Sequence, residues 1–228
     1  LALTYNDKCN NTDRILMICD EADELMKMKS EAVTGNRKAT ILLYRLRALL
    51  SLQKYKYGLK VLSEFDKKYF PNETLYNWYL FKEIEFKLYF QSHDIDKSYD
   101  ISNQVFNNKS YSRQVDQLTE KWKIYHAYLV FLDNYLNKGD YKKFSLPKFL
   151  NSVQVNSKDK SGFNFAIRII ELLFQFARGE DAMVFHKMDA LRVYRSRYLN
   201  DNTYKRNHLF LSLLNKKKKS GFDYKVTL

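Results

Sequence analysis

The stretch "LNKGDYKKF" (residues 136–144) places a tight turn between two segments whose apolar residues have helical spacing. The same arrangement, an aromatic-rich helix, a turn and a second amphipathic helix, is expected at "LQKYKYGLKVL" (52–62), "QSHDIDKSYDI" (91–101) and "ARGEDAMVF" (177–185). Aligning the corners at Gln53, His93, Gly139 and Ala177 gives spacings of 40, 46 and 38 residues. A period of this size predicts a chain built from helical repeats.

Apolar residues recur at three- and four-residue spacing along nearly the whole chain, which indicates helix. The 228 residues include only 6 Gly and 2 Pro, too few turn residues for a sandwich or barrel of this length. The sequence therefore predicts an all-α fold. The expected helices are 11–33, 37–52, 55–70, 74–91, 95–108, 111–137, 141–152, 163–178, 180–199 and 203–215.

Small residues stand where the second helix of a pair must approach the first, at Gly58, Ser98 and Ala182. Phe144 takes this place in the third pair, so a regular second helix is not expected there. With Gly139-Asp140-Tyr141 at its corner, the chain resembles the tetratricopeptide (TPR-like) repeat class over residues 37–200, although the Trp-Leu-Gly signature of the first helix is absent.

The segment "NSKDKSGFNFAIRIIELLFQFARGEDAM" together with "RVYRSRYL" (192–199) is similar to an uncharacterised bacterial family of TPR-like proteins. This resemblance implies an antiparallel array of helical hairpins wound into a right-handed superhelix, an α-solenoid. It brings no activity with it.

We expect one helical-repeat domain over residues 1–228. It would consist of an N-terminal helix within 1–36, about four irregular hairpins in 37–200 and a basic C-terminal cap in 201–228. The chain opens with Leu1-Ala2-Leu3 rather than Met, and no signal-peptide pattern follows, so a fragment of a longer protein is expected.

The net charge of +13 is unevenly distributed. Ten Lys and Arg against two Asp lie between His186 and Lys219. This balance favours nucleic acid, an anionic membrane surface or an acidic protein as partner. The candidate side chains are Arg192, Arg195 and Arg197, interleaved with two tyrosines, and Lys216, Lys217, Lys218 and Lys219. The alternative is a solvated, lysine-rich helix end that closes the array.

In TPR-like proteins the exposed edges of successive first helices line a concave groove that receives a peptide or a partner helix. The resemblance assigns Arg47, Glu83, Lys87, His126, Asp133, Asn164, Arg168, Glu171 and Gln175 to such a groove. The last four are spaced 4, 3 and 4 residues apart and form one polar stripe on an otherwise apolar helix. The competing interpretation is that all nine are solvated edges of amphipathic helices.

"SKDKSGFN" (157–164) has the outline of a calcium loop, but Ser157 and Arg168 stand where carboxylates are required. An anion or acidic partner fits better, bound by Lys158, Lys160 and the free amides at Ser161 and Gly162, since a helix follows. The alternative is a helix N-cap.

The sequence contains no catalytic signature and no expected metal or cofactor site. The acidic cluster 20–24 has no histidine in ligand spacing and is expected to be a solvated face. Cys9 and Cys19 lack a CxxC context, which favours free thiols in a reducing compartment such as the cytoplasm. No run of 18 apolar residues occurs.

These patterns predict a non-enzymatic protein-interaction or scaffold module that binds a peptide or partner helix. The alternative is a nucleic-acid-associated regulatory or sensor domain that uses the basic C-terminal region. An enzymatic role remains mainly through a missing part of a longer chain.

Overall fold

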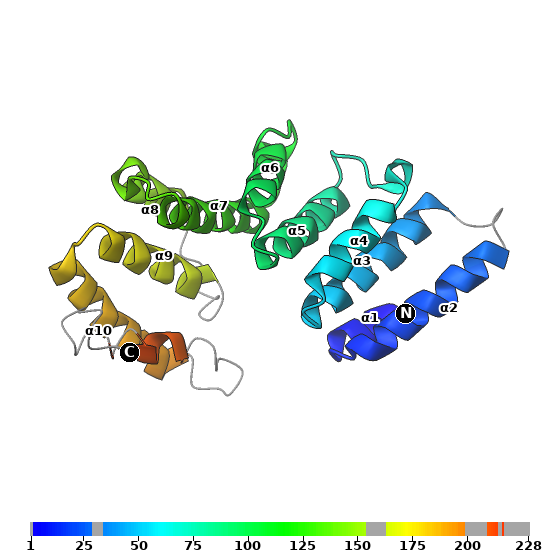
Figure 1. Ribbon diagram of the computed structural model, residues 1–228, viewed down its shortest axis with the longest axis horizontal. Helices are drawn as coiled ribbons and strands as arrows, with labels where there is room; N and C mark the ends of the chain where they lie inside the picture. Colours follow the sequence, from blue (N-terminus) through cyan, green and yellow to red (C-terminus); the bar gives the residue numbers. More distant parts are fainter. Residues whose placement is uncertain (1, 29–33, 154–162, 199–208, 214–215, 217–228) are drawn as a thin grey trace. The chain divides into compact units, whose positions relative to one another are not determined.

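A computed structural model describes residues 2–28, 34–153, 163–198, 209–213 and 216 of the chain (Figure 1). Within these ranges the regular elements are α-helices and short 3₁₀ turns, with no strand. The predicted all-α class is confirmed. No helix in the described ranges is long and apolar enough to cross a membrane.

The chain divides into two compact units, residues 1–115 and 116–228, which are described separately. In its described residues the first holds six α-helices: α1 (Ala2–Lys8), α2 (Thr12–Met28), α3 (Gly35–Ser51), α4 (Tyr55–Glu64), α5 (Tyr76–Gln91) and α6 (Ile95–Phe106). The second holds α7 (Asp116–Leu136), α8 (Leu146–Ser152), α9 (Phe163–Ala177) and α10 (Asp181–Tyr198), and residues 209–213 are also helical.

Five helix pairs are joined by the same backbone corner. A residue in the left-handed conformation follows α1, α3, α5, α7 and α9, and these residues are Asn10, Gln53, His93, Lys138 and Gly179, with φ between 50° and 70°. The next residue donates its N–H to the carbonyl five positions earlier, at 2.8 to 3.0 Å in all five corners. This is the Schellman arrangement that ends a helix without any particular side chain.

The corners are 43, 40, 45 and 41 residues apart. The sequence predicted two of them at the correct residue, Gln53 and His93. The third lies at Lys138 rather than Gly139. Gly139 is the residue after the left-handed one, and a Cβ atom there would collide with Asn134. The fourth lies at Gly179 rather than Ala177, and the corner at Asn10 was not predicted.

Three predicted helices are interrupted. The segment 55–70 stops at Glu64 and resumes as a 3₁₀ turn, Lys67–Tyr69, in which the Asp66 carboxylate accepts from Lys68 N at 3.1 Å. The segment 111–137 begins with the 3₁₀ turn Tyr111–Arg113 before α7. The segment 141–152 begins with the 3₁₀ turn Tyr141–Lys143, and α8 starts only after the cap at Ser145. The late start agrees with the irregular second helix expected from Phe144.

The core of the first unit forms where α3 packs against α2, α4 and α5. Leu46 and Leu88 are fully buried in its main cluster. Gly58 of α4 lies against this cluster, and a Cβ atom there would come within 2.8 Å of Leu88 Cδ2. A close approach at Gly58 is therefore present, but it is to α5, the first helix of the next pair, and not to α3 as predicted. Ser98 of α6 is also buried, as expected where α6 packs on α5.

In the second unit, α9 packs against α7, α8 and α10. Phe174 of α9 lies in the cluster shared with α7 and α8, and Leu172 lies in the cluster shared with α10. The expectation that Ala182 marks the close approach is wrong, because Ala182 is exposed and Val184 is buried instead. The two-residue error follows from placing the corner at Ala177.

Candidate functional site

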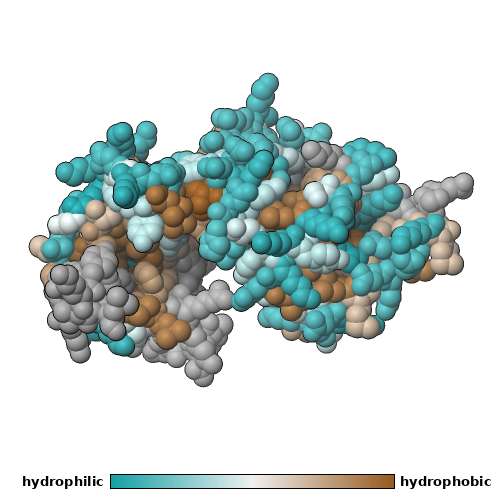
Figure 2. Space-filling model, viewed as in Figure 1, coloured by the Kyte–Doolittle hydropathy of each residue, from teal (hydrophilic) through white to brown (hydrophobic). Residues whose placement is uncertain are grey.

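An open groove with a volume of about 1190 Å³ lies in the first unit, between the C-terminal half of α2, the N-terminal half of α3 and the end of α4. Its apolar floor includes Ile41 and Leu42 of α3, together with Val61 of α4 and the adjoining Phe65. Leu25 and Met28 of α2 also line it, and they are 58% and 80% exposed. Figure 2 shows hydrophobic surface among hydrophilic atoms at this end of the unit.

The α2 wall of the groove is acidic. Asp20, Glu21, Asp23 and Glu24 all line it, and Glu64 at the end of α4 adds a fifth carboxylate. Three cations, Lys27, Lys38 and Arg45, line the same space. The groove thus joins an exposed apolar strip to a carboxylate-rich wall.

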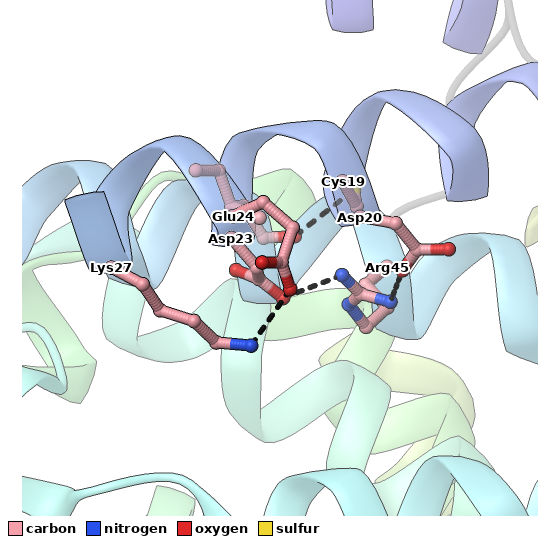
Figure 3. A network of polar contacts seen from close by, with 7 residues as sticks. Cys19, Asp20, Asp23, Glu24, Lys27 and Arg45 are labelled. Carbon is pink, nitrogen blue, oxygen red and sulfur yellow. Dashed lines mark hydrogen bonds and ion pairs between the residues drawn. The ribbon is translucent and has the colours of Figure 1, made fainter.

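Arg45 ties the two long helices together at this wall (Figure 3). It donates one hydrogen bond to Asp20 Oδ1 at 2.5 Å and another to Asp23 Oδ2 at 2.7 Å. Its side chain is only 14% exposed. Burial alone lowers the pKa of Arg45, but the two carboxylates outweigh it, so the pKa is raised. The guanidinium is therefore a permanent charge in this position.

Cys19 lies buried beside this network, and its Sγ is 3.7 Å from the Ile41 carbonyl oxygen. Burial raises the pKa of this thiol to about 11, with opposing contributions from Arg45, which lowers it, and from Asp23 and Asp20, which raise it. A thiol that stays protonated at neutral pH is a poor nucleophile. Both cysteines are free.

The acidic wall does not have the features of a metal site. Arg45 occupies the carboxylates of Asp20 and Asp23, and Lys27 contacts Glu24 Oε1 at 2.7 Å (Figure 3). In the described part of the chain, no group of three or more His, Cys, Asp and Glu side chains could hold a metal ion.

The groove residues that the sequence predicts in the first unit, Arg47, Glu83 and Lys87, all form ion pairs. Arg47 contacts Asp7 at 3.0 Å, and Lys87 contacts Glu83 at 2.7 Å within α5. None of these three predicted residues lines the groove between α2, α3 and α4. Their assignment to a partner-binding surface stays a prediction.

The predicted groove residues of the second unit have several different environments. Glu171 pairs with Lys187 at 2.7 Å, and Arg168 lies 4.9 Å from the ring centre of Tyr194. The carboxylate of Asp133 accepts from Asn137 at 2.7 Å.

Asn164 and Gln175, at the two ends of the polar stripe, are only 2% and 4% exposed. The expectation of a solvent-facing stripe is wrong at these two positions, because α9 has neighbours on several sides. His126 of α7 is half-buried, and burial lowers its pKa, so it is neutral at physiological pH.

Part of the predicted basic surface is described. Arg192 and Arg197 on α10 are exposed, Arg195 belongs to the same helix, and Lys216 is exposed. Lys217, Lys218 and Lys219 lie outside the described residues. So do all four residues of the predicted anion site, Lys158, Lys160, Ser161 and Gly162.

Sequence reasoning found the acidic cluster but missed the groove. One signal was available: the carboxylates at 20–24 are followed at once by "LMKM" (25–28), so an acidic and an apolar surface adjoin on one helix.

The chain matches no protein-family model, no curated protein and no solved structure.

Proposed function

We propose that this chain is a non-enzymatic protein-interaction module of the TPR-like type, and that the groove between α2, α3 and α4 receives a peptide or a partner helix. The groove itself is the observation that supports this proposal most strongly. Leu25 and Met28 expose apolar side chains above an apolar floor instead of covering it. Contiguous exposed apolar surface with a polar rim is typical of interaction sites.

The recurring corners support the array architecture. Five left-handed residues at 40- to 45-residue spacing mark five helix pairs. Two successive first helices also pack on one another in each unit, α3 on α5 in the first and α7 on α9 in the second. Packing of this kind inside a unit supports the proposed right-handed α-solenoid. The free thiols suit a reducing compartment such as the cytoplasm.

A selection experiment tests the proposal. Peptides selected from a displayed helical library on the wild-type chain would be retested by fluorescence anisotropy on the double variant Leu25→Glu/Met28→Glu. Binding should weaken by about tenfold or more, because two carboxylates would face an apolar ligand. Met17→Glu is the matched control, since Met17 is exposed on the same helix outside the groove. Equal binding to the double variant and the control would refute the groove.

A second candidate function is a nucleic-acid-associated role. Residues 116–228 hold 21 Lys and Arg against 11 Asp and Glu, and Arg192 and Arg197 are exposed. An oligonucleotide bound there should dissociate steeply as salt rises, and replacement of Lys216 to Lys219 by Ala should flatten that dependence. Absence of binding at low salt would eliminate this candidate.

A further inference from the structure

We infer that the occupant of the α2, α3 and α4 groove is a cationic amphipathic helix of a partner protein, with apolar side chains on one face and Lys or Arg beside them. This inference rests on the proposed function and names the chemistry of the partner. It opposes the expectation from the net charge, which favours an acidic partner.

The walls determine how a partner can be recognised. All three are helices, whose main-chain N–H and C=O groups are bonded within the helix, so they offer no edge to an extended peptide. Recognition therefore depends on side chains, as when an amphipathic helix lies in an apolar groove. From Asp20 to Met28 the α2 wall is about 12 Å long, or about two helical turns. That length suits about three anchors, spaced i, i+3 or i+4, and i+7.

The charge of the groove lining determines which charge a partner should carry. Five carboxylates and three cations line the groove, a net charge of −2 in a chain of +13. All three cations are already engaged. Arg45 holds Asp20 and Asp23, and Lys27 contacts Glu24 Oε1 at 2.7 Å. Lys38 Nζ lies 4.3 Å from the ring centre of Tyr69.

The remaining carboxylates are available to a cationic ligand. Among the described residues, Glu21 and Glu64 form long ion pairs of 3.8 Å, with Arg14 and Lys60, between exposed side chains. Such pairs contribute little, so an incoming Lys or Arg can replace them. Glu24 is also exposed, although it contacts Lys27. An acidic ligand would instead meet like charge on the α2 wall.

Three synthetic peptides separate the contributions of shape and charge. Each has about 18 residues, long enough for helix formation. The first carries three Leu anchors flanked by Lys. The second replaces every Lys by Glu, and the third replaces every Leu by Ser. Affinities are measured by fluorescence anisotropy for the wild type, for Glu21→Lys/Glu24→Lys, and for the matched control Glu73→Lys/Asp100→Lys. Both control residues are exposed in the same unit and lie outside the groove.

The Leu/Lys peptide should bind the wild type and the control alike, and should bind the Glu21→Lys/Glu24→Lys variant about tenfold more weakly. The Leu/Glu peptide should bind only that variant. If the Leu/Glu peptide binds the wild type as tightly as the Leu/Lys peptide, the inferred charge is wrong while the proposed groove stands. If the Ser/Lys peptide binds as tightly as the Leu/Lys peptide, or no peptide binds, the apolar groove itself is refuted.

Sedimentation of the wild type and of Leu25→Glu/Met28→Glu tests whether a second copy of the chain occupies the groove instead. Association of the wild type that the substitutions abolish would assign the groove to a second copy of the chain and overturn the inference. Monomeric behaviour of both proteins is the expected result.

Discussion

Gly58 of α4 lies so close to Leu88 of α5 that a Cβ atom would approach Leu88 Cδ2 to 2.8 Å and Cδ1 to 3.3 Å. Leu88 is fully buried and has little space to move. Gly58→Ala should therefore lower the free energy of unfolding by about 1 kcal/mol, since overpacking costs about 1–3 kcal/mol and the better helix propensity of Ala returns about 1 kcal/mol.

A double-mutant cycle with Leu88→Ala checks this close approach. Once Leu88 is truncated, the same Gly58→Ala substitution should become stabilising by about 1 kcal/mol in urea unfolding. If Gly58→Ala has the same effect in both backgrounds, the two residues do not limit each other.

At the left-handed corners, substitution to Gly should raise the free energy of unfolding and substitution of Gly by Ala should lower it. Gln53→Gly should raise the free energy of unfolding by about 0.5 kcal/mol, because Gln at φ 59° is strained and Gly is not. Gly179→Ala should lower it by about 1 kcal/mol from backbone strain alone, since no heavy atom lies within 4 Å of the added Cβ.

The control for the Gln53→Gly substitution is Ser51→Gly, two residues earlier at the end of α3. It should be destabilising by about 0.5 kcal/mol, as Gly is in ordinary helical conformation. A destabilising Gln53→Gly would contradict the assigned corner.

The helices and two of the corners could be predicted because both depend on local sequence. Apolar spacing gives the helices, and Gln53 and His93 follow helices with clear patterns. The corner at Asn10 was missed because α1 has only seven residues, too few to establish a period. The breaks after Glu64 and before α8 depend on side-chain caps, such as Ser145, that also occur in continuous helices.

The groove could not be predicted because its parts are distant in the sequence. Arg45 lies 25 residues from Asp20 and 22 from Asp23, so the sequence shows a carboxylate cluster without its cation. The polar stripe of α9 led to the opposite error. Periodicity places Asn164 and Gln175 on one edge, but only tertiary packing determines whether that edge is covered.

Arg45 should matter more to stability than the other arginines of the N-terminal helices. Arg45→Met keeps much of the aliphatic stem but removes both charge-assisted hydrogen bonds, and should cost about 1–2 kcal/mol. The cost stays below that of a fully buried pair because the Asp20 and Asp23 side chains are 69% and 45% exposed and can be hydrated.

Two variants provide the comparison for Arg45. Arg45→Lys should recover only part of the loss, because an ammonium cannot reproduce the two-pronged geometry. Arg14→Met removes a 3.8 Å exposed pair and should change the unfolding free energy by less than about 0.5 kcal/mol. Equal effects of Arg45→Met and Arg14→Met would mean that the network is not stabilising.

Cys19 should make stability fall at alkaline pH. Its pKa is raised from 9.0 to about 11 by burial, so the folded chain holds this proton more tightly than the unfolded chain. The stabilising contribution is complete below pH 9.0 and is lost as the pH rises towards 11, by about 3 kcal/mol in total.

Urea unfolding between pH 8 and pH 11 measures this contribution, with Cys19→Ala as reference because other groups titrate in the same range. The stability difference between wild type and Cys19→Ala should shrink as the pH rises. Cys9→Ala, which replaces the exposed thiol, is the matched control. A constant difference for Cys19→Ala would contradict the raised pKa.

The five corners have a consequence for how such a chain can evolve. The left-handed positions are filled by Asn, Gln, His, Lys and Gly, so no side-chain chemistry is shared among them, while the backbone bond across each corner is the same. Mutation can therefore exchange the residue at a corner for about 1 kcal/mol or less and leave the turn intact. The repeat in this architecture therefore lies in the backbone conformation of its corners, and the residue at a corner can change without changing the turn.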